Sequence, residues 1–360
     1  MVRLSWGIAL VPAIKELNLS YAQAGLVSAL FYAGYTLGSL PWGHFIDLKG
    51  PRKAIMYSSS LLSFFTILFS LSNSFFTISL FSFLSGLSGG AIFPSSIKLV
   101  YIMSKDSQMT SMIGLMETAA PLSLLLTTIL TPLIFNWHLF YFSLGLTISL
   151  LPVSCFIMKE DYKKKGSLNV RGIFNKDLSL LVLARFGGQW GTYGTSTWFF
   201  SVLVLYANIS TSFSALYFSI YAIGQLISSM VSGKISRGRE KRSLIVFLSL
   251  FSVTLIAFSF SYDLASNVFL FPLISFSMGF FSFAYRPSMD SIITKKAGRE
   301  NTGKSMGYAN AVTQLGTVIS PSIVGFALDQ NLGVTGSMLI LSLGPIISLV
   351  SSLPIREKVS

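Results

Sequence analysis

Charge and cysteine are both scarce in this sequence. Only 11% of its 360 residues are charged, whereas 52% are hydrophobic, and the mean hydropathy is +0.68. A chain with so few charged side chains cannot form the polar surface that a soluble globular protein needs. The single cysteine, Cys155, excludes an intrachain disulfide and a cysteine-rich metal site. These two shortages leave a membrane protein as the class that fits.

What the sequence has instead is long apolar runs with few or no charged residues. They fall at about 17–46, 54–72, 74–97, 109–135, 139–158, 178–206, 211–233, 243–262, 264–293, 305–328 and 331–355. Each can cross a hydrocarbon core of about 30 Å as a helix that rises about 1.5 Å per residue. Residues 1–14 form a shorter run. We expect an all-α membrane protein whose first helix is truncated at its N-terminus, with the missing half upstream of Met1.

The net charge of +13 comes from Lys and Arg clusters between the runs and not from a basic domain, so no nucleic-acid partner is expected. The clusters fall in every second connection. The other connections contain one lysine, Lys15, and no arginine. By the positive-inside rule, the basic connections and the C-terminus are cytoplasmic. The longest connection, 159–177, is a linker between an N-terminal bundle (1–158) and a C-terminal bundle (178–360). We expect a monomeric, multi-pass protein of the cell membrane.

The two halves repeat each other at a nearly constant offset. The pairs related by 190 positions are Asn18 and Asn208, Ser20 and Ser210, Gly34 and Gly224, Gly43 and Gly233, and Arg52 and Arg242. At an offset of 193, the residues Phe83, Gly86, Pro94 and Gly114 fall on Phe276, Gly279, Pro287 and Gly307. With six spans in each half, both copies have the same orientation in the membrane. In proteins built this way, the solute site lies near the bilayer midplane between the repeats.

A charged turn follows the second predicted span. It reads Gly43-His-Phe-Ile-Asp47-Leu-Lys-Gly50-Pro-Arg52-Lys53. Asp47 stands at the C-terminal end of a predicted helix, where the helix dipole disfavours a negative charge, so its carboxylate needs a partner. The candidates are Arg52 and the N-terminus of a helix from the other half. Gly50 permits the tight reversal of the chain.

This turn resembles the signature loop of the major facilitator superfamily, G-x-x-x-D-x-x-G-x-R-K, at the place where that family carries it. The resemblance covers the whole chain, because the span count, the central basic loop and the repeat agree as well. It implies the facilitator fold of two six-helix bundles. It also implies a gate that latches the two halves on the cytoplasmic side in the outward-open state, formed by Gly43, Asp47, Gly50, Arg52 and Lys53. The second copy departs from the pattern, since Arg237 and Glu240 stand at the positions of the Asp and the second Gly.

Arg3 is a charged residue near the middle of the first helix, provided that this helix extends upstream of Met1. A cation at that depth costs roughly 2.5 to 3.5 kcal/mol on insertion scales, which favours a functional role. In the family the first helix faces the central cavity. The resemblance therefore implies contact between Arg3 and an anion or carboxylate group. If Met1 is the true start, Arg3 is a flanking charge instead.

An offset of 190 places Arg3 on Tyr193, within the run Gln189-Trp190-Gly-Thr-Tyr193. Glycines interrupt the packing of this predicted helix, while its amide and aromatic groups can hydrogen-bond to a solute and stack on it. We therefore predict a substrate-binding site that contains Arg3, Gln189, Trp190 and Tyr193. The alternative is that this run only packs against neighbouring helices.

Glu117 and Arg286 each lie roughly two turns inside the predicted cytoplasmic boundary. The sequence leaves two roles open for them. They can act as buried charge partners that neutralise each other or neighbouring loop charges, or Glu117 can carry a proton through the transport cycle, as a buried carboxyl group with a raised pKa can.

Two other patterns have simpler explanations. Residues 298–305 match the phosphate-binding loop G-x-x-x-x-G-K-S, but that loop needs a strand before it and a helix packed on a sheet after it. Apolar spans flank the match here, so ATP is not an expected ligand. Asn18-Leu-Ser20 and Asn208-Ile-Ser210 fit the glycosylation pattern, yet Ser20 with Gln23 is also a capping box, and Ser210 is its equivalent.

Together these features predict a secondary transporter that moves a small solute by alternating access. Proton coupling and a small organic anion as the solute are the options that the charged residues raise. The sequence shows no intramembrane His cluster, Ser-His arrangement or paired carboxylates, so an enzyme, a metal site and a cofactor are not expected. The expected partners are a small-molecule substrate and the lipid bilayer. The alternative function is a non-transporting membrane sensor or receptor on the same scaffold.

Overall fold

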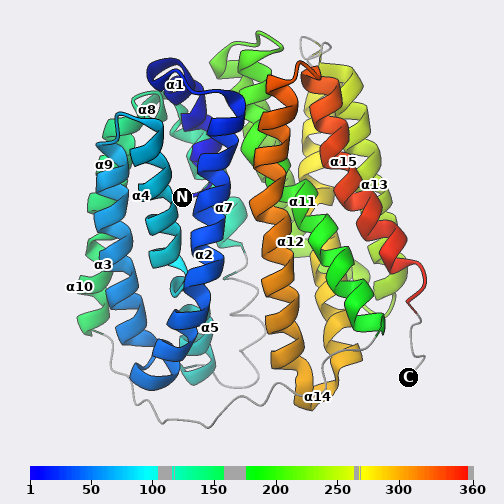
Figure 1. The fold of residues 1–360 in the computed structure, drawn as a ribbon. Helices are drawn as coiled ribbons and strands as arrows, with labels where there is room; N and C mark the ends of the chain where they lie inside the picture. Colours follow the sequence, from blue (N-terminus) through cyan, green and yellow to red (C-terminus); the bar gives the residue numbers. More distant parts are fainter. Residues whose placement is uncertain (104–115, 117, 158–175, 263–266, 268, 356–360) are drawn as a thin grey trace.

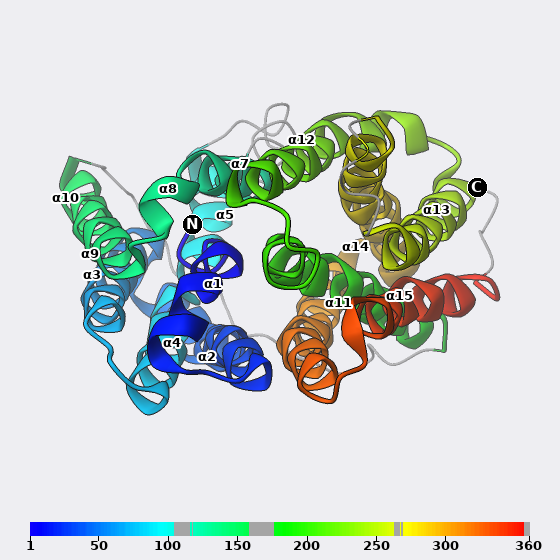
Figure 2. The ribbon, with the colours of Figure 1, turned by 90° about the horizontal axis from the view of Figure 1, so that it is seen from above.

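The computed structural model describes residues 1–103, 116, 118–157, 176–262, 267 and 269–355, and the described chain is helical throughout, as predicted. One group of helices lies on one side of the molecule, and a second group lies beside it (Figures 1 and 2). The first group contains α1 (Trp6–Leu17), α2 (Tyr21–Lys49), α3 (Pro51–Ser70), α4 (Phe75–Gly89), α5 (Ile92–Met103), α7 (Ala119–Ile129), α8 (Thr131–Ile134), α9 (Trp137–Ile148) and α10 (Leu150–Ile157). The second contains α11 (Lys176–Leu205), α12 (Thr211–Ser236), α13 (Glu240–Ser261), α14 (Leu270–Asp329) and α15 (Gly333–Ser352).

The surface of these helices is apolar enough for a bilayer. Five stretches of the described chain are long and apolar enough to cross a membrane: Pro51–Ser70, Phe75–Ser96, Thr211–Ser236, Glu240–Ser261 and Gly333–Ser352. In each, 44% of the most apolar window is buried inside the protein, so more than half of it faces outward. The outward side chains include Phe64, Phe76 and Leu273. Exposure of such an apolar surface is unfavourable in water but not in the hydrocarbon core of a bilayer. The chain is therefore a multi-pass membrane protein.

The two ends of the molecule differ in charge. The α2–α3 and α12–α13 turns and the bend in α14 lie together at one end, which we call the basic end (Figure 1). Its described charged residues include Lys49, Arg52, Lys53, Lys234, Arg237, Arg239, Lys241, Arg242, Lys295 and Lys296. The α1–α2, α11–α12 and α14–α15 turns lie at the other end, which we call the opposite end. The basic and non-basic connections that alternate along the sequence thus lie at opposite ends of the structure.

Helix caps form where the sequence predicted them. The Ser20 side chain accepts a hydrogen bond from the Gln23 N–H, and the Gln23 side chain accepts one from the Ser20 N–H, so the capping box at α2 is confirmed. Ser210 caps α12 in the same way by accepting from Phe213. Just before these caps, Asn18 and Asn208 have left-handed backbone angles, with φ of 49° and 52°. Asn tolerates this region better than most residues, and it reverses the chain at equivalent points of the two halves.

The internal repeat is also present in three dimensions. A Cβ atom on Gly34 would collide with the carbonyl oxygen of Phe83, and one on Gly224 would collide with that of Phe276. These four residues are the ones that the offsets of 190 and 193 relate. Both halves therefore use the same close crossing between their second and fourth predicted spans, which needs a residue without a side chain.

The chain differs from the prediction at the bend in α14. The sequence predicts two spans joined by a basic loop, whereas the structure has one continuous helical segment of 60 residues whose two arms meet at the basic end (Figure 1). Residues 298–305 are helical. A phosphate-binding loop requires non-helical backbone whose N–H groups surround the phosphate, so the structure disfavours the nucleotide interpretation of this segment.

The two halves contact each other between the middle of the molecule and the opposite end. Ser201 Oγ on α11 donates to the Gly7 carbonyl on α1 at 2.6 Å. Ser219 Oγ on α12 donates to Thr128 Oγ1 on α7, also at 2.6 Å. At the basic end, a Cβ on Gly43 would meet no atom within 4 Å. Among the described residues, the halves are therefore joined at the opposite end, and open space lies beside Gly43.

Candidate functional site

Arg3 lies where the two halves meet. Its guanidinium carbon is 5.9 Å from the centroid of the Tyr32 ring on α2 and 5.4 Å from that of the Tyr193 ring on α11. The two rings contact each other edge to face, with centroids 5.6 Å apart. Aromatic rings attract a cation to their faces but do not neutralise it. Arg3 is thus held at the interface as a charged group.

Arg286, on α14, reaches the same tyrosine from within the C-terminal half. Its Nη2 donates to Gln189 Oε1 at 3.1 Å and to the Tyr193 hydroxyl at 3.5 Å. Its guanidinium carbon is 4.3 Å from the centroid of the Phe283 ring and 5.9 Å from that of Tyr193. Two cations, one from each half, therefore contact the Tyr193 ring.

The electrostatics of this arrangement favour an anion. Like charges repel each other over longer distances in a protein of low dielectric than in water. Among the residues that the structure describes, no Asp or Glu forms an ion pair with Arg3. The basic end behaves differently, because there Arg185 pairs with Asp290 at 3.2 Å and Lys296 pairs with Asp177 at 2.6 Å. A carboxylate or similar group near Arg3 and Arg286 would be attracted by the positive charge of both guanidinium groups.

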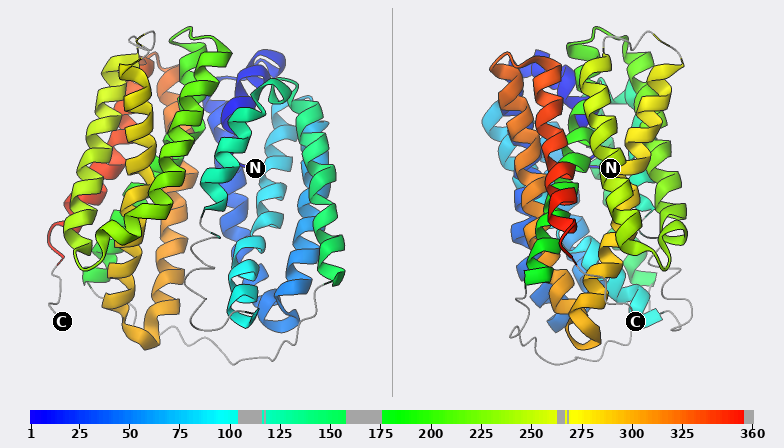
Figure 3. Two further views of the ribbon diagram at one scale, coloured as in Figure 1. Left: turned by 180° about the vertical axis from the view of Figure 1, so that it is seen from behind. Right: turned by 90° about the vertical axis from the view of Figure 1, so that its right-hand side faces the viewer.

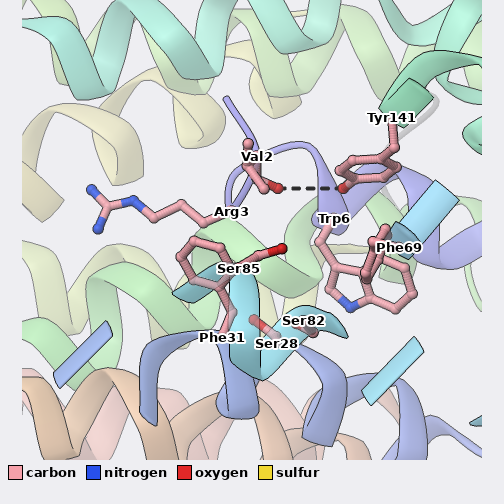
Figure 4. A pocket seen from close by; sticks show the side chains of 9 residues that line it. All are labelled: Val2, Arg3, Trp6, Ser28, Phe31, Phe69, Ser82, Ser85 and Tyr141. Atoms are coloured by element: carbon pink, nitrogen blue, oxygen red, sulfur yellow. Dashed lines mark hydrogen bonds between the residues drawn. The ribbon is translucent and has the colours of Figure 1, made fainter. Parts of the chain in front are cut away.

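A cavity lies beside Arg3, inside the N-terminal half (Figure 4). Its empty volume is about 300 Å³, which includes space open to the surroundings. Its lining consists of Val2, Arg3, Trp6, Ser28, Phe31, Phe69, Ser82, Ser85 and Tyr141. The Arg3 side chain extends away from the aromatic wall formed by Trp6, Phe69 and Tyr141. The cavity therefore borders the stem of Arg3 and not its guanidinium, and its lining is largely apolar, with serine hydroxyls on one side.

The signature turn has the geometry that its sequence predicts. Gly50 has φ of 87°, in the region that favours glycine, and its N–H donates to the Ile46 carbonyl at 3.0 Å to end α2. Pro51 then begins α3. Arg52 Nε donates to the Cys155 carbonyl on α10, within the same half. The Asp47 side chain lies outside the described part of the structure.

Comparison with known proteins decides the family. The sequence profile of the Major Facilitator Superfamily matches residues 1–237 and, in a second match, 181–360. The chain belongs to the major facilitator superfamily. As a facilitator protein it is a secondary transporter of a small molecule, not an enzyme, and the family and fold that the signature turn implied are confirmed.

Relatives of this facilitator protein are named as carriers of organic acids. The gentisate transporter of Corynebacterium glutamicum is 21% identical, over 93% of this chain and 79% of its own length. The probable galactarate/D-glucarate transporter GarP of Escherichia coli is 24% identical, over 91% and 84%. The benzoate transport protein of Acinetobacter baylyi is 20% identical, over 98% and 85%.

Solved structures support the facilitator fold independently. A bacterial homologue of the human lysosomal transporter Spinster, in an inward-facing and occupied conformation, superimposes with a TM-score of 0.79 at 15% identity. That likeness covers 100% of this chain and 95% of the other. The unoccupied inward-facing form gives a TM-score of 0.80 at 13% identity. At such low identity the likeness shows the fold alone.

Three of the four predicted substrate-binding residues of this facilitator protein lie together. Arg3, Gln189 and Tyr193 form one cluster, which Arg286 joins. Trp190 is placed differently, because its indole N–H donates to the Ile340 carbonyl at 3.1 Å and so ties α11 to α15.

The proposed pairing of Arg286 with Glu117 involves a residue outside the described part of the chain. The pairing stays a prediction, and the described hydrogen-bond partners of Arg286 are Gln189 and Tyr193. The sequence interpretation missed Tyr32 and Phe283, whose rings contact the two cations. Neither residue differs, in sequence, from the many other aromatic residues of the spans, so no signal in one sequence distinguishes them.

Proposed function

We propose that this facilitator protein transports a small organic anion, which binds between Arg3 and Arg286 at the interface of the two halves. The single observation that carries the proposal is the pair of guanidinium groups on opposite halves that share the Tyr193 ring. An anion there would contact both halves at once. Its binding would therefore respond to their relative movement, as a transport site requires.

The relatives' names point to the same chemistry. Gentisate, galactarate, glucarate and benzoate, for which they are named, share a carboxylate group and differ in the rest of the molecule. A carboxylate matches the planar donor fork of arginine, which can form two parallel hydrogen bonds with it. The largely apolar lining beside Arg3 matches the aromatic rings of gentisate and benzoate better than the hydroxylated chains of galactarate and glucarate. We infer a carboxylate as the group that the site recognises.

The proposed cycle alternates between the two ends. We infer that the basic end, with the linker and the C-terminus, faces the cytoplasm, in line with the positive-inside rule. The state described here, with contacts at the opposite end, is then open toward the cytoplasm. In the reverse state the basic end closes, and we propose that the signature turn (Gly43, Asp47, Gly50, Arg52 and Lys53) then contacts the C-terminal half.

Glu117 is our candidate for proton coupling. It is the only carboxylate well inside the predicted spans of the first half, and a proton taken up there would enter the membrane with an anionic substrate. Glu117→Gln should therefore remove the dependence of transport on a proton gradient while substrate exchange continues. An unchanged pH dependence of uptake in that variant would exclude Glu117 from coupling.

A binding experiment tests the anion site directly. A ligand that binds the folded protein raises its free energy of unfolding by about 2.7 kcal/mol at a concentration of 100 times its Kd. We expect benzoate or glucarate to raise the melting temperature of the purified protein in detergent, and benzamide, the neutral analogue of benzoate, to have no effect. Stabilisation by benzamide equal to that by benzoate would contradict a site that recognises carboxylate.

A further inference from the structure

A carboxylate joins the two halves at the opposite end of the molecule. Asp329 Oδ1 accepts a hydrogen bond from the backbone N–H of Tyr21 at 2.9 Å, and Oδ2 accepts one from that of Ala22 at 2.8 Å. Asp329 is the last residue of α14, and Tyr21 and Ala22 are the first two residues of α2. The two helices belong to different halves. One side chain thus uses both of its oxygens to bridge them.

The position of this carboxylate is explained by α2 and not by its own helix. A negative charge at the C-terminal end of α14 is disfavoured by the dipole of that helix. The N-terminal end of α2 offers the reverse, a positive dipole and free N–H groups. The capping residue Ser20 accepts a hydrogen bond only from the Gln23 N–H, at 3.2 Å, so the N–H groups of Tyr21 and Ala22 need another acceptor. Asp329 supplies it from the other half.

Close packing surrounds the bridge. A Cβ on Gly25 would collide with the Pro321 carbonyl oxygen, and one on Gly325 would collide with the Tyr21 carbonyl oxygen. The backbones of α2 and α14 therefore touch within about two turns of the carboxylate, on the side of the bridge that faces the middle of the molecule. The bridge forms only while the halves are this close, because a hydrogen bond is lost when its atoms separate by more than a fraction of an ångström beyond contact.

We propose that Asp329 is a latch that stabilises the state closed at the opposite end and contributes nothing to the state open there. Opening that end would release the carboxylate and the two N–H groups into water. Helix α2 would then have a carboxylate contact for each state: Asp329 at its N-terminus, and its own Asp47 at its C-terminus. The two contacts would be broken and made in alternation as α2 moves against the C-terminal half.

The test is a distance between the two halves at the opposite end. Spin labels on Asn73→Cys and Ser212→Cys, exposed positions in the N- and C-terminal halves, report its opening by pulsed electron resonance in a Cys155→Ser background. In Asp329→Asn an amide NH₂ replaces one acceptor and faces a backbone donor. We expect the ratio of closed to open molecules to fall about tenfold, because the substitution removes the charge that strengthens the hydrogen bonds from the Tyr21 and Ala22 N–H groups.

Ser20→Ala is the matched control, because Ser20 caps the same helix end from within the same half. This substitution should lower the free energy of unfolding and leave the distribution of distances between the two spin labels unchanged. A distribution in Asp329→Asn identical to that of the parent would overturn the proposal, as would an equal shift in Ser20→Ala. Melting temperature and yield confirm that each variant folds. The readout needs no substrate, so it remains decisive even if the proposed anion specificity is wrong.

Transport kinetics give a second readout that general damage would not reproduce. A variant that favours the state open at the opposite end should lower the apparent KM for substrate added on that side and raise it on the basic side, because apparent affinity scales with the population of the competent state. Damage to the fold would raise the apparent KM on both sides. Equal KM values from the two sides, unchanged from the parent, would contradict the latch.

Discussion

Arg3→Gln lowers the kcat/KM for uptake of an organic anion by about 10- to 100-fold, because a hydrogen bond between charged partners is worth about 1.5–3 kcal/mol and 1.4 kcal/mol corresponds to a factor of ten. Glutamine keeps much of the length and some donors but removes the charge. Arg3→Lys keeps the charge but loses the planar donor fork, so we expect intermediate activity. Arg286→Gln should resemble Arg3→Gln, since the two guanidinium groups share the Tyr193 ring.

Lys15→Gln provides the matched control for this prediction. Lys15 is a cation on α1, the helix that follows Arg3 in the chain, and it is exposed near the opposite end and away from the cluster. Its loss should leave uptake within about twofold of the parent, because an exposed charge is screened by solvent and salt. Initial rates of labelled substrate uptake, normalised to the amount of folded protein, measure all four variants. Normal anion uptake in Arg3→Gln and Arg286→Gln would remove the cluster from the substrate site.

Asp47→Asn moves the conformational equilibrium in the direction opposite to Asp329→Asn and severely reduces transport. The signature turn is free of close contact at Gly43 in the state described here, so we place its function in the other state, in which the basic end is closed. Loss of the Asp47 charge then destabilises only that state, and more molecules remain open at the basic end. We expect at least a tenfold fall in transport with nearly unchanged protein abundance, and the same label pair should show a smaller open fraction.

Combining the two substitutions sharpens the prediction. If Asp47 and Asp329 stabilise opposite states, the Asp47→Asn/Asp329→Asn double variant should have a distance distribution closer to the parent than either single variant. Lys49→Gln, an exposed neighbour outside the signature pattern, should leave both transport and distances unchanged. A loss of folded protein in Asp47→Asn that matches its loss of transport would show that the turn is structural and not a gate.

The fold could be predicted from the sequence because its determinants are local or periodic. Apolar runs, alternating basic connections and capping serines are each visible within a few tens of residues. The offset of 190 goes further, since it relates Arg3 to Tyr193, and the structure brings these two side chains into contact. In two parallel repeats related by an axis along the membrane normal, equivalent residues that lie close to this axis come near each other at the interface between the repeats. The candidate site could therefore be found in part without a structure.

The remaining contacts depend on how the two halves meet, which periodicity does not encode. The Asp329 bridge joins residues 308 positions apart, and a carboxylate at a helix C-terminus looks unfavourable until its partner helix is known. Trp190 illustrates the reverse case. The residue types in its run suggested a substrate contact, but the turn of α11 that carries Trp190 faces α15. In a helix, neighbouring residues point about 100° apart, so Gln189 contacts α14 while Trp190 contacts α15.

Gradient-driven flux in proteoliposomes tests the central claim most directly. Purified protein is reconstituted, and uptake of labelled benzoate, gentisate and glucarate is followed with and without an imposed proton gradient. The account predicts that at least one of these carboxylates accumulates in the lumen, that unlabelled carboxylates compete and benzamide does not, and that Arg3→Gln abolishes the accumulation. Carboxylate binding by folded protein without any flux would contradict it and favour a sensor, and flux of cations or neutral sugars in place of carboxylates would contradict the anion site.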